Sequence, residues 1–537
     1  MWWKHGVLYQ IYPRSFMDSN GDGIGDLRGI ITKLDYLNDG TEKSLGIDGV
    51  WLSPFFRSPM RDFGYDISDY RDIDPMFGTL EDFKLLLREA HARHIHVIID
   101  LVLNHTSDEH PWFQESRQNG NGVTAHWYIW HPGKNGRPPN NWFSQFELRS
   151  AWWYDQQRGE FYLGTFTRHQ PEVNWRNASL RKEMFDLVRH WLDMGVDGFR
   201  FDVINWFIKD DQFRSNPLSL RDVDLHKHIY DRNRPETIDI CRELRTMTDS
   251  YKERMMVGEV YTDELDIASS YYGNGTDALH LVFDFDFLFQ PWSAGRMCKS
   301  LVEWYAKLPA GAWPTFTLSN HDNLRHCLRY AKGKWTVARA KVAAALLITL
   351  RSVPLLYYGE ELGMSGGRLR REDLVDPLSK KTWPLRKYRR DLARTPMQWD
   401  GSLNAGFSNG KPWLPVDSRF PSCNAEEQGK SEDSLLSFYK RLIQLRKKHE
   451  ALKSGDIQFK VEYLPNALVY VREHETEKVL VVLNFTARRM SLNPPTLSQR
   501  IEVLLGSHRV VGETLALDQS PDIGPYEIVI GKENRGK

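Results

Sequence analysis

The 537-residue sequence predicts an α/β fold: a (β/α)8 TIM barrel with a small domain inserted after strand three and a C-terminal antiparallel β domain. Three observations support this prediction. Eight short runs rich in β-forming residues alternate with stretches of helical periodicity. About ninety residues separate the third run from the fourth, far more than one crossover helix needs. The final segment alternates apolar and polar residues, which is the pattern of an antiparallel sheet.

The eight apolar runs predict barrel strands at residues 7–12, 49–54, 96–103, 198–203, 255–261, 279–285, 315–319 and 353–358. Helices are predicted between them at 79–94, 180–194, 237–249, 295–307 and 336–350. Thr79 and Asp82 can start the first helix as a capping box, because the threonine hydroxyl accepts an unpaired backbone N–H. Crossovers of this length imply parallel pairing, and eight such units close a barrel.

The spacing divides the chain into three domains: a barrel of residues 1–104 and 171–450, an inserted domain of 105–170, and a C-terminal β-sandwich of 451–537. A structureless loop as long as the second segment is improbable, so we interpret it as a domain. A second irregular insert covers about 363–415. Beyond a helix at 435–448, strands are predicted at 467–472, 479–485, 501–505 and 527–530.

Composition excludes several classes of partner. Lys+Arg and Asp+Glu both number 71, and a nucleic-acid-binding protein would carry a basic excess. No membrane span is expected, because the most apolar helical run, 338–350, is short and contains two basic residues. The N-terminus lacks the features of a signal peptide. The four cysteines are far apart without a CxxC pair, so we expect free thiols and a cytoplasmic protein.

Polar residues follow five of the predicted strands, at the end of a barrel where active sites are built. They are Tyr65 and Asp66 after strand two, His105 after strand three, Arg200 and Asp202 in strand four, Glu259 in strand five, and His321 and Asp322 after strand seven. One such residue is explained by helix capping. Five strand ends together predict a catalytic pocket.

The strand-four and strand-five carboxyls predict glycoside hydrolysis with retention of configuration. Arg200 and Asp202 are two residues apart, so their side chains leave the same face of the strand. We expect the guanidinium to lower the pKa of Asp202 and keep it ionised as a nucleophile. We expect Glu259, beside that charge in a cleft that excludes water, to be protonated and to act as the acid. Retention requires carboxyl groups about 5 Å apart.

Other residues are candidates for holding a sugar. Asp322 is a third acid that can bind hydroxyls as positive charge develops, and His105 and His321 supply hydrogen-bond donors. Tyr65 and Phe166 are candidate stacking partners for the apolar face of a sugar ring, although aromatic residues more often fill a core.

An oxygen-rich loop follows the first strand. Asp18, Asn20, Asp22 and Asp26 occupy positions 1, 3, 5 and 9 of a calcium-loop pattern, with Gly23 at position 6. The closing glutamate is absent at position 12. We predict a structural Ca²⁺ here, with a bare turn as the alternative, and no catalytic metal or organic cofactor.

These motifs resemble those of the α-amylase family of glycoside hydrolases (family 13), in its α-glucosidase and oligo-1,6-glucosidase branch. The matching segments are 100–105 (DLVLNH), 198–202 (GFRFD), 258–260 (GEV), 320–322 (NHD), 170–174 (QPEVN, usually QPDLN), 394–399 (RTPMQW) and the loop at 18–26. The resemblance covers nearly the whole chain. It implies the three-domain architecture already indicated by spacing.

Roles for single residues follow from the resemblance. It implies Asp202 as nucleophile, Glu259 as acid/base and Asp322 as transition-state stabiliser. It implies that a closed pocket grips the terminal glucose through Asp66, His105, Arg200, His321, Asp322 and Arg394. It also places Gln170 in the branch-specific motif, and Ile24 as a carbonyl ligand of the calcium loop. Val203, after the nucleophile, is typical of α-1,6-acting members, whereas segments 376–384 and 394–397 are similar to enzymes of α-1,4 or broader preference.

The implied function is a retaining, exo-acting α-glucosidase that releases glucose from short α-1,6- or α-1,4-linked oligosaccharides through a covalent glucosyl-enzyme. An α-glucosyltransferase or sucrose isomerase of the same family would use the same acids. A trehalose-6-phosphate hydrolase should have a more basic pocket; the basic cluster 368–371 is better interpreted as a solvated face. A non-catalytic partner subunit is disfavoured because all three acids are present. The oligomeric state stays open.

Overall fold

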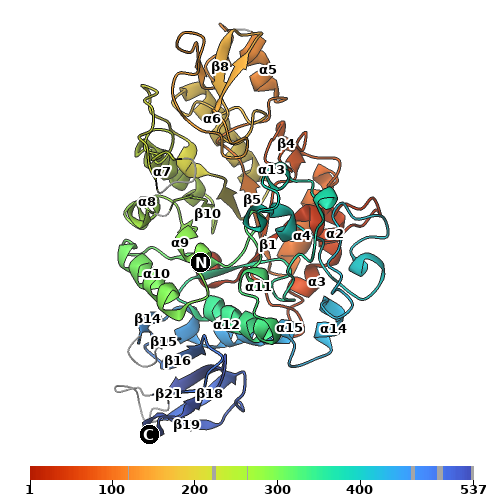
Figure 1. The fold of residues 1–537 in the computed structure, drawn as a ribbon, viewed down its shortest axis with the longest axis vertical. Coiled ribbons are helices and arrows are strands. Elements are labelled where there is room, and N and C mark those ends of the chain that lie inside the picture. Colours follow the sequence, from red (N-terminus) through yellow and green to blue (C-terminus); the bar gives the residue numbers. More distant parts are fainter. Residues whose placement is uncertain (119, 221–224, 263, 461–465, 493–499, 534–537) are drawn as a thin grey trace.

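The computed structural model describes residues 1–118, 120–220, 225–262, 264–460, 466–492 and 500–533. Its largest sheet has eight parallel strands in the order β11-β10-β9-β5-β2-β1-β13-β12. Their bounds are β1 (Leu8–Ile11), β2 (Gly49–Leu52), β5 (His96–Leu101), β9 (Gly198–Phe201), β10 (Met255–Gly258), β11 (Leu281–Val282), β12 (Thr315–Thr317) and β13 (Val353–Tyr357). A parallel bridge between Phe283 and Thr315 joins the two edges and closes the barrel. All eight predicted strands are confirmed. Figure 1 labels three of them, β1, β5 and β10, in the middle of the molecule.

Helices connect the strands. The longer ones are α4 (Leu80–Ala92), α6 (Ala178–Asp193), α7 (Glu236–Asp249), α10 (Ala294–Lys307), α12 (Thr336–Thr349) and α15 (Leu435–Lys448). The shorter ones are α1 (Trp2–His5), α2 (Leu27–Thr32), α3 (Leu34–Leu37), α8 (Leu265–Ser270), α9 (Phe285–Phe289), α11 (His326–Arg329), α13 (Pro377–Lys381), α14 (Ala425–Gly429) and α16 (Glu450–Lys453). The capping box is confirmed: Thr79 accepts from the Asp82 N–H, and Asp82 accepts from the Thr79 N–H.

One predicted strand is shorter than expected. Residues 279–285 were predicted as a strand, but β11 covers only Leu281–Val282. Asp284 ends the run, because its side chain caps α9 by accepting from the Phe287 N–H at 3.0 Å. An aspartate at a helix start accepts a hydrogen bond from a backbone N–H that has no partner inside the helix.

The barrel interior changes from apolar to polar along its axis. One apolar cluster contains alternate strand residues, among them Leu8, Trp51 and Ile98. Side chains two positions further along a strand share the same face. The side chains two positions beyond these apolar residues therefore also face the barrel interior. In β5 and β9 the residues at this level are Asp100 and Arg200, which are register partners on neighbouring strands. The interior thus has an apolar floor below a layer of buried polar side chains.

The inserted region forms its own small sheet. β6 (Trp130–His131), β7 (Trp152–Asp155) and β8 (Glu160–Leu163) pair antiparallel in the order β6-β8-β7, and α5 (Pro111–Gln118) precedes them. This region stands at the top of Figure 1. A separate two-stranded hairpin, β3 (Phe56–Arg57) with β4 (Asp69–Ile73), was not predicted. Its turn, 58–68, brings part of the site described below over the barrel.

The C-terminal region is a six-stranded sheet in the order β14-β15-β16-β21-β18-β19, with a two-stranded sheet of β17 and β20. The bounds are β14 (Asp456–Phe459), β15 (Ala467–His474), β16 (Glu477–Asn484), β17 (Met490–Ser491), β18 (Arg500–Gly506), β19 (Thr514–Ala516), β20 (Asp522–Ile523) and β21 (Ile528–Glu533). The four predicted strands correspond to β15, β16, β18 and β21. Residues 461–465, 493–499 and 534–537 of the predicted domain lie outside the described residues.

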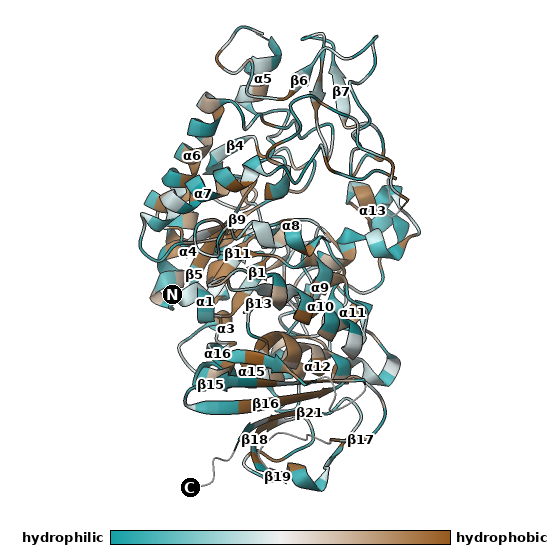
Figure 2. Cartoon of the chain, turned by 90° about the vertical axis from the view of Figure 1, so that its left-hand side faces the viewer, coloured by the Kyte–Doolittle hydropathy of each residue, from teal (hydrophilic) through white to brown (hydrophobic). Residues whose placement is uncertain are grey.

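Both faces of this larger sheet are buried. Leu468, Tyr470 and Val481 belong to the main core, whereas Val469, Val482 and Val503 form a second cluster on the other face. Figure 2 shows the sheet lying under α12 and α15. In the described part of the chain, no helix combines the length and apolarity that crossing a membrane requires.

Candidate active site

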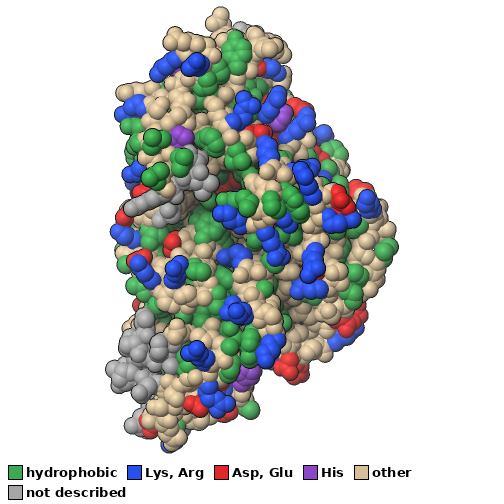
Figure 3. Space-filling view, viewed as in Figure 1, with side chains coloured by type: hydrophobic (Ala, Val, Ile, Leu, Met, Phe, Trp, Pro, Cys, Tyr) green, Lys and Arg blue, Asp and Glu red, His purple; other side chains and the backbone are tan. Residues whose placement is uncertain are grey.

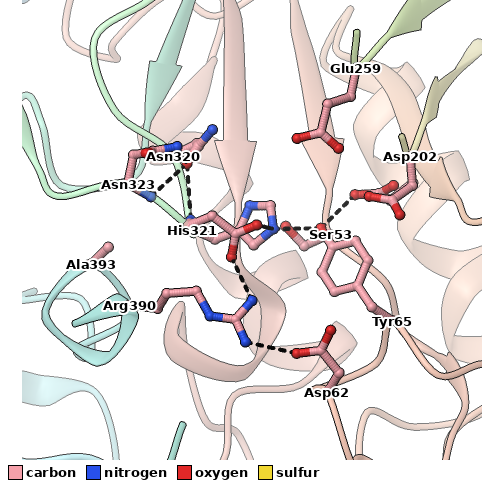
Figure 4. Close-up of polar contacts among 12 residues, drawn as sticks. Ser53, Asp62, Tyr65, Asp202, Glu259, Asn320, His321, Asn323, Arg390 and Ala393 are labelled. Atoms are coloured by element: carbon pink, nitrogen blue, oxygen red, sulfur yellow. Dashed lines mark hydrogen bonds and ion pairs between the residues drawn. The ribbon is translucent and has the colours of Figure 1, made fainter. Parts of the chain in front are cut away.

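Asp202 and Glu259 share one arginine. Arg200 Nη1 lies 2.5 Å from Asp202 Oδ1, and Nη2 lies 2.5 Å from Glu259 Oε2. Nη1 also contacts Asp100 Oδ1 at 2.9 Å. β9 and β10 are neighbours in the barrel, so consecutive strand ends present the two carboxyls to the same space (Figure 4). Their side chains are 8% and 10% exposed, so each carboxyl keeps a small accessible surface.

The expected pKa of Asp202 was wrong in direction. Burial raises the pKa of Asp202 well above its usual range, against the opposing effect of Arg200, and repulsion from Glu259 and Asp100 adds to it. The sequence indicated one arginine for one aspartate, whereas the structure gives one guanidinium to three carboxyls. If all were ionised, this buried cluster would have a net charge of −3 + 1 = −2. Because buried unbalanced charge is costly, the cluster retains a proton.

A chain of hydrogen bonds orients His321 behind this cluster. Gln10 Nε2 lies 2.9 Å from His321 Nδ1, and the Tyr65 hydroxyl lies 2.7 Å from His321 Nε2. Tyr65 also donates to Asp100 Oδ2 at 2.9 Å, and its ring is stacked on the imidazole. Burial lowers the pKa of His321 to about 3 and raises the pKa of Asp100 to about 6. The histidine is therefore neutral.

Asp322 lies in a second cluster with two arginines. Arg394 Nη2 contacts Asp322 Oδ1 at 2.7 Å, and Arg390 Nη1 contacts the same oxygen at 3.2 Å. Although burial opposes it, the charges of Arg390 and Arg394 hold the pKa of Asp322 far below its usual range. Its side chain is 34% exposed. An ionised carboxylate with one open side suits a group that binds sugar hydroxyls as positive charge develops.

Asp62, rather than the predicted Asp66, reaches this cluster. Arg390 Nη2 contacts Asp62 Oδ1 at 2.8 Å, as Figure 4 shows. Asp66 is fully buried, and its oxygens accept from Ser58 Oγ and from the backbone N–H groups of Arg61 and Asp62. Asp66 therefore shapes the turn that presents Asp62. Neither Asp62 nor Arg390 was singled out in the sequence; an acid before a Gly turn and an arginine four residues before Arg394 were the available signals.

The remaining predicted pocket residues lie together on the inserted-domain side. Gln170 Nε2 contacts Asp62 Oδ2 at 3.2 Å and His105 Nε2 at 3.1 Å. Burial lowers the pKa of His105 to about 3, so this histidine is neutral too. The Phe166 ring lies 5.3 Å from the His105 ring. These residues form a wall of neutral hydrogen-bonding groups and one aromatic face.

Val203 has a backbone conformation that is unusual for a branched residue. Its φ of 37° and ψ of 45° are left-handed, and it precedes a short 3-10 helix, Ile204–Trp206. A β-branched residue there is a genuine outlier. Its N–H donates to Glu259 Oε2 at 3.2 Å, and its side chain packs on Phe166 and Trp206. This turn thus places the Val203 side chain beside Phe166 and directs the Val203 N–H to the Glu259 carboxyl.

A buried lysine joins the barrel to the inserted domain. Lys209 Nζ contacts Asn104 Oδ1 at 2.9 Å and forms an ion pair with Glu172 Oε2. Asn104 Nδ2 is 3.2 Å from His105, and Glu172 Oε1 accepts from the Thr165 N–H, next to Phe166. Lys209 therefore fixes two segments that line the pocket. The sequence did not single it out, because a lysine eight residues beyond the end of a strand has no local pattern.

The loop at 18–26 is a series of tight turns. Asp18 Oδ1 accepts from the Asn20 and Gly21 N–H groups, Asn20 Oδ1 from Asp22, and Asp22 Oδ1 from Ile24. Asp26 caps α2 through the Gly29 N–H. Gly23 is required, because a Cβ there would lie 1.9 Å from the Lys411 carbonyl oxygen. Across the described residues, no three His, Cys, Asp or Glu side chains are grouped as metal ligands. The donors are all oxygens, which suits Ca²⁺, so the metal stays a prediction.

Comparison with known proteins agrees with this geometry. The family model "Alpha amylase, catalytic domain" matches residues 10–455. A probable alpha-glucosidase of Rhizobium meliloti (strain 1021) is 42% identical over 96% of this chain and 94% of its own length. An oligo-1,6-glucosidase of Parageobacillus thermoglucosidasius is 41% identical over 91% of each chain. The crystal structure of an alpha-glucosyl transfer enzyme superposes with a TM-score of 0.91 at 39% identity, covering 99% of both chains. The chain therefore belongs to the α-amylase family of glycoside hydrolases.

Proposed function

We propose that this protein is a retaining, exo-acting α-glucosidase that releases glucose from the non-reducing end of short α-linked oligosaccharides. The observation that carries the proposal is the binding of Asp202 and Glu259 to adjacent nitrogens of Arg200. Carboxyls held side by side on one guanidinium suit the short separation of retaining enzymes, about 5 Å, rather than the wider one of inverting enzymes. The relatives named alpha-glucosidase and oligo-1,6-glucosidase support the same substrate class.

The proposed reaction has two steps. An Asp202 oxygen attacks the anomeric carbon while Glu259 gives its proton to the departing glycosidic oxygen, and the C–O bond breaks. Glu259 then takes a proton from water, the water oxygen attacks the anomeric carbon, and Asp202 leaves as a carboxylate. Asp322, ionised and partly open to the pocket, stabilises the positive charge that develops in both steps.

Exo action is supported by the wall of the pocket. Arg390 is 5% exposed and Asp62 3%, and their ion pair, with Asp376 on the same guanidinium, fills the space beside Asp322. A buried ion-pair network leaves no passage for a continuing glucan chain. One terminal glucose can therefore be held there, with the leaving sugar directed outward.

The test is an assay panel of p-nitrophenyl α-glucoside, maltose, isomaltose, sucrose and trehalose, with the released anomer followed by NMR. We expect α-glucose as the first product from the non-reducing end. Release of β-glucose would rule out retention, and cleavage inside longer chains would rule out exo action.

Glucosyl transfer is the second candidate, supported by the likeness to the alpha-glucosyl transfer enzyme. Both activities use the same glucosyl-enzyme and differ in whether water or a sugar accepts the glucose. Sucrose isomerisation is a third outcome of the same chemistry. Product analysis with maltose or sucrose at high concentration separates them, since transfer gives longer or isomeric sugars and hydrolysis gives monosaccharides.

Linkage preference is proposed to include α-1,6 bonds. Val203 is 7% exposed and packs on Phe166 at the pocket. Val203→Thr keeps the branched shape but adds a hydroxyl, so the rate ratio of isomaltose to maltose should fall. An unchanged ratio would remove this residue from linkage choice.

Two further properties are proposed. We place a structural Ca²⁺ at the Asp18 loop, and chelation should then lower the melting temperature; no shift, with no metal by elemental analysis, would favour the bare turn.

We also place the protein in the cytoplasm. All four cysteines are free, and three of them are buried, as expected in a reducing compartment.

A further inference from the structure

A bulky aromatic residue has a strained backbone in the turn that carries Asp62 and Tyr65. Phe63 follows Asp62 directly, and its φ is 52°, in the left-handed region. An aromatic side chain there is an outlier, because glycine, asparagine and aspartate are the residues that adopt this region readily. Such strain persists only where the surrounding structure holds it, and it gathers at functional sites. Phe63 is therefore a candidate for a specific role in the site.

The Phe63 ring contacts the arginine that holds Asp322. The guanidinium carbon of Arg394 lies 5.5 Å from the centroid of the Phe63 ring and 5.5 Å from that of the Tyr12 ring. The same guanidinium donates to Asp322 Oδ1 at 2.7 Å and to the His321 carbonyl oxygen at 2.9 Å. A cation within about 6 Å of an aromatic face is attracted to it. The two rings thus orient Arg394, and Arg394 orients Asp322.

A second arginine contacts the same ring. Lys and Arg side chains are spread over the face seen in Figure 3, where water solvates their charge. Arg14 is instead half-buried, and its Nε and Nη1 have no hydrogen-bond partner among the described residues. Its guanidinium carbon lies 5.4 Å from the centroid of the Phe63 ring and 4.8 Å from that of the Trp413 ring. Aromatic faces therefore take the place of carboxylates around this cation.

Trp413 connects the Phe63 ring to the loop at 18–26. The centroids of the two rings lie 5.6 Å apart. Trp413 Nε1 donates to Ser15 Oγ at 3.0 Å, and the Trp413 backbone N–H donates to the Gly23 carbonyl oxygen at 3.0 Å. The position of the Phe63 ring is thus determined from outside its own turn, as a strained backbone requires.

We propose that Phe63 is a positioning residue of the active site, which presents an aromatic face from a strained turn and so holds the Arg394 guanidinium and, through it, Asp322. The inference rests on the proposed function for its kinetic readout. The backbone alone favours asparagine at this position, whereas an aromatic ring is what attracts the guanidinium. A purely structural role predicts the opposite result for a substitution: a loss of stability with no loss of turnover.

The test compares Phe63→Asn with Phe63→Tyr and Phe63→Leu. Phe63→Asn should keep or raise the melting temperature, because asparagine tolerates the left-handed region, and should lower kcat about tenfold. KM should change less, since Asp322 acts on charge that develops in the transition state. Phe63→Tyr keeps the aromatic face and should retain normal kcat. Phe63→Leu keeps apolar bulk and the same strain without the aromatic face, so its kcat should fall as in Phe63→Asn.

Phe213→Asn is the matched control. Phe213 also has a left-handed backbone, with a φ of 51°, and is half-buried. The rings around it belong to His131, Trp142 and Trp152 of the inserted domain. Its substitution should therefore leave kcat and KM unchanged. An equal loss of kcat in Phe213→Asn would overturn the proposal.

The outcomes distinguish this inference from the proposed function. Loss of stability in Phe63→Asn with kcat within about twofold of normal overturns the inference. If Phe63→Asn is too unstable to assay, Phe63→Leu decides, and normal kcat in that variant overturns it too. If no sugar of the assay panel is cleaved, a crystal structure of Phe63→Asn gives the answer. Loss of the 2.7 Å contact between Arg394 and Asp322 supports the inference, and an unmoved contact overturns it.

Discussion

The two halves of the candidate active site differ in their ratio of cations to carboxyls. Arg200 alone serves Asp100, Asp202 and Glu259. On the opposite side, Arg390 and Arg394 serve Asp62, Asp322 and Asp376. Both groups lie at the same barrel end, and all their members are buried except Asp322, whose side chain is 34% exposed. The difference that all members share is in charge balance.

This difference separates the protonation of the two halves. In the one-arginine cluster, burial raises the pKa of Asp100 and of Asp202. In the two-arginine cluster burial acts in the same direction and raises the pKa of Asp62, yet the arginines hold the pKa of Asp322 and of Asp376 below their usual range. The first half can keep a proton to give away, and the second keeps a fixed negative charge. A retaining mechanism needs both.

The largest expected effect is in the one-arginine cluster. Asp202→Ala and Glu259→Gln should each lower kcat by about 10³-fold or more, because one removes the bond-forming group and the other the proton donor. Steady-state kinetics with isomaltose and maltose measure this. Circular dichroism should show an unchanged fold, and near-normal hydrolysis by either variant would contradict the assignment.

The next effect concerns the two-arginine cluster. Arg390→Gln leaves Arg394 as the only arginine for three carboxyls, so kcat/KM should fall about 10²-fold. Arg390 lowers the pKa of Asp322. Its removal raises that pKa, so Asp322 ionises only at higher pH and the acidic limb of the kcat/KM profile moves upward. Arg389→Gln, at the neighbouring position, is the control. Equal losses of kcat/KM in the two variants would show that Arg390 has no specific role in the site.

A third comparison separates Asp62 from Asp66. Asp62→Asn should raise KM about tenfold, because the ion pair that holds the Arg390 side of the pocket wall is lost. The change in melting temperature should be small, since Arg390 keeps its ion pair with Asp376. Asp66→Asn should instead lower the melting temperature, since Asp66 is fully buried and accepts from the backbone of its own turn. If Asp66→Asn raised KM while the melting temperature stayed constant, the sequence-based choice of Asp66 would be restored.

The smallest effect sharpens the charge comparison. Repulsion from Asp100 is one of the causes that raise the pKa of Asp202. Asp100→Asn therefore lowers that pKa, Asp202 stays ionised to lower pH, and the acidic limb of kcat/KM should move downward by up to about one pH unit. This shift is opposite in sign to that of Arg390→Gln. Asp69→Asn, on the β4 hairpin strand, should leave the profile in place; a shift of the same sign in the Asp100 and Arg390 variants would refute the charge-balance account.

The sequence predicted the barrel well, because its signals are local. Apolar runs and a capping box such as Thr79 with Asp82 depend on neighbours within one element. The hairpin of β3 and β4 and the small strands β17 and β20 were missed. β3, β17 and β20 have two residues each and therefore no periodicity to detect, and the five residues of β4 (DYRDI) carry no alternating apolar pattern. The apparent length of β11 was overestimated for a related reason: the Asp284 cap interrupts an apolar run without changing its composition.

The site was predicted in part, with the limits set by tertiary contact. Strand-end positions identified Asp202, Glu259 and Asp322, because a barrel gathers all strand ends. The choice between Asp62 and Asp66 depends on a turn whose path the sequence does not display. The pKa of Asp202 depends on how many carboxyls share Arg200, which only the assembled barrel reveals. Lys209 and Arg390 pair with residues far away in the sequence, so no pattern among their sequence neighbours identifies them.

The left-handed backbone at Val203 has a consequence for laboratory evolution. A branched side chain in that conformation costs about 1–3 kcal/mol relative to a relaxed residue. Screens for heat resistance should therefore recover glycine at this position, since glycine adopts the conformation without strain. Such variants would lose the valine methyl groups that contact Phe166, so a gain in thermal stability at this position should be accompanied by a changed linkage preference.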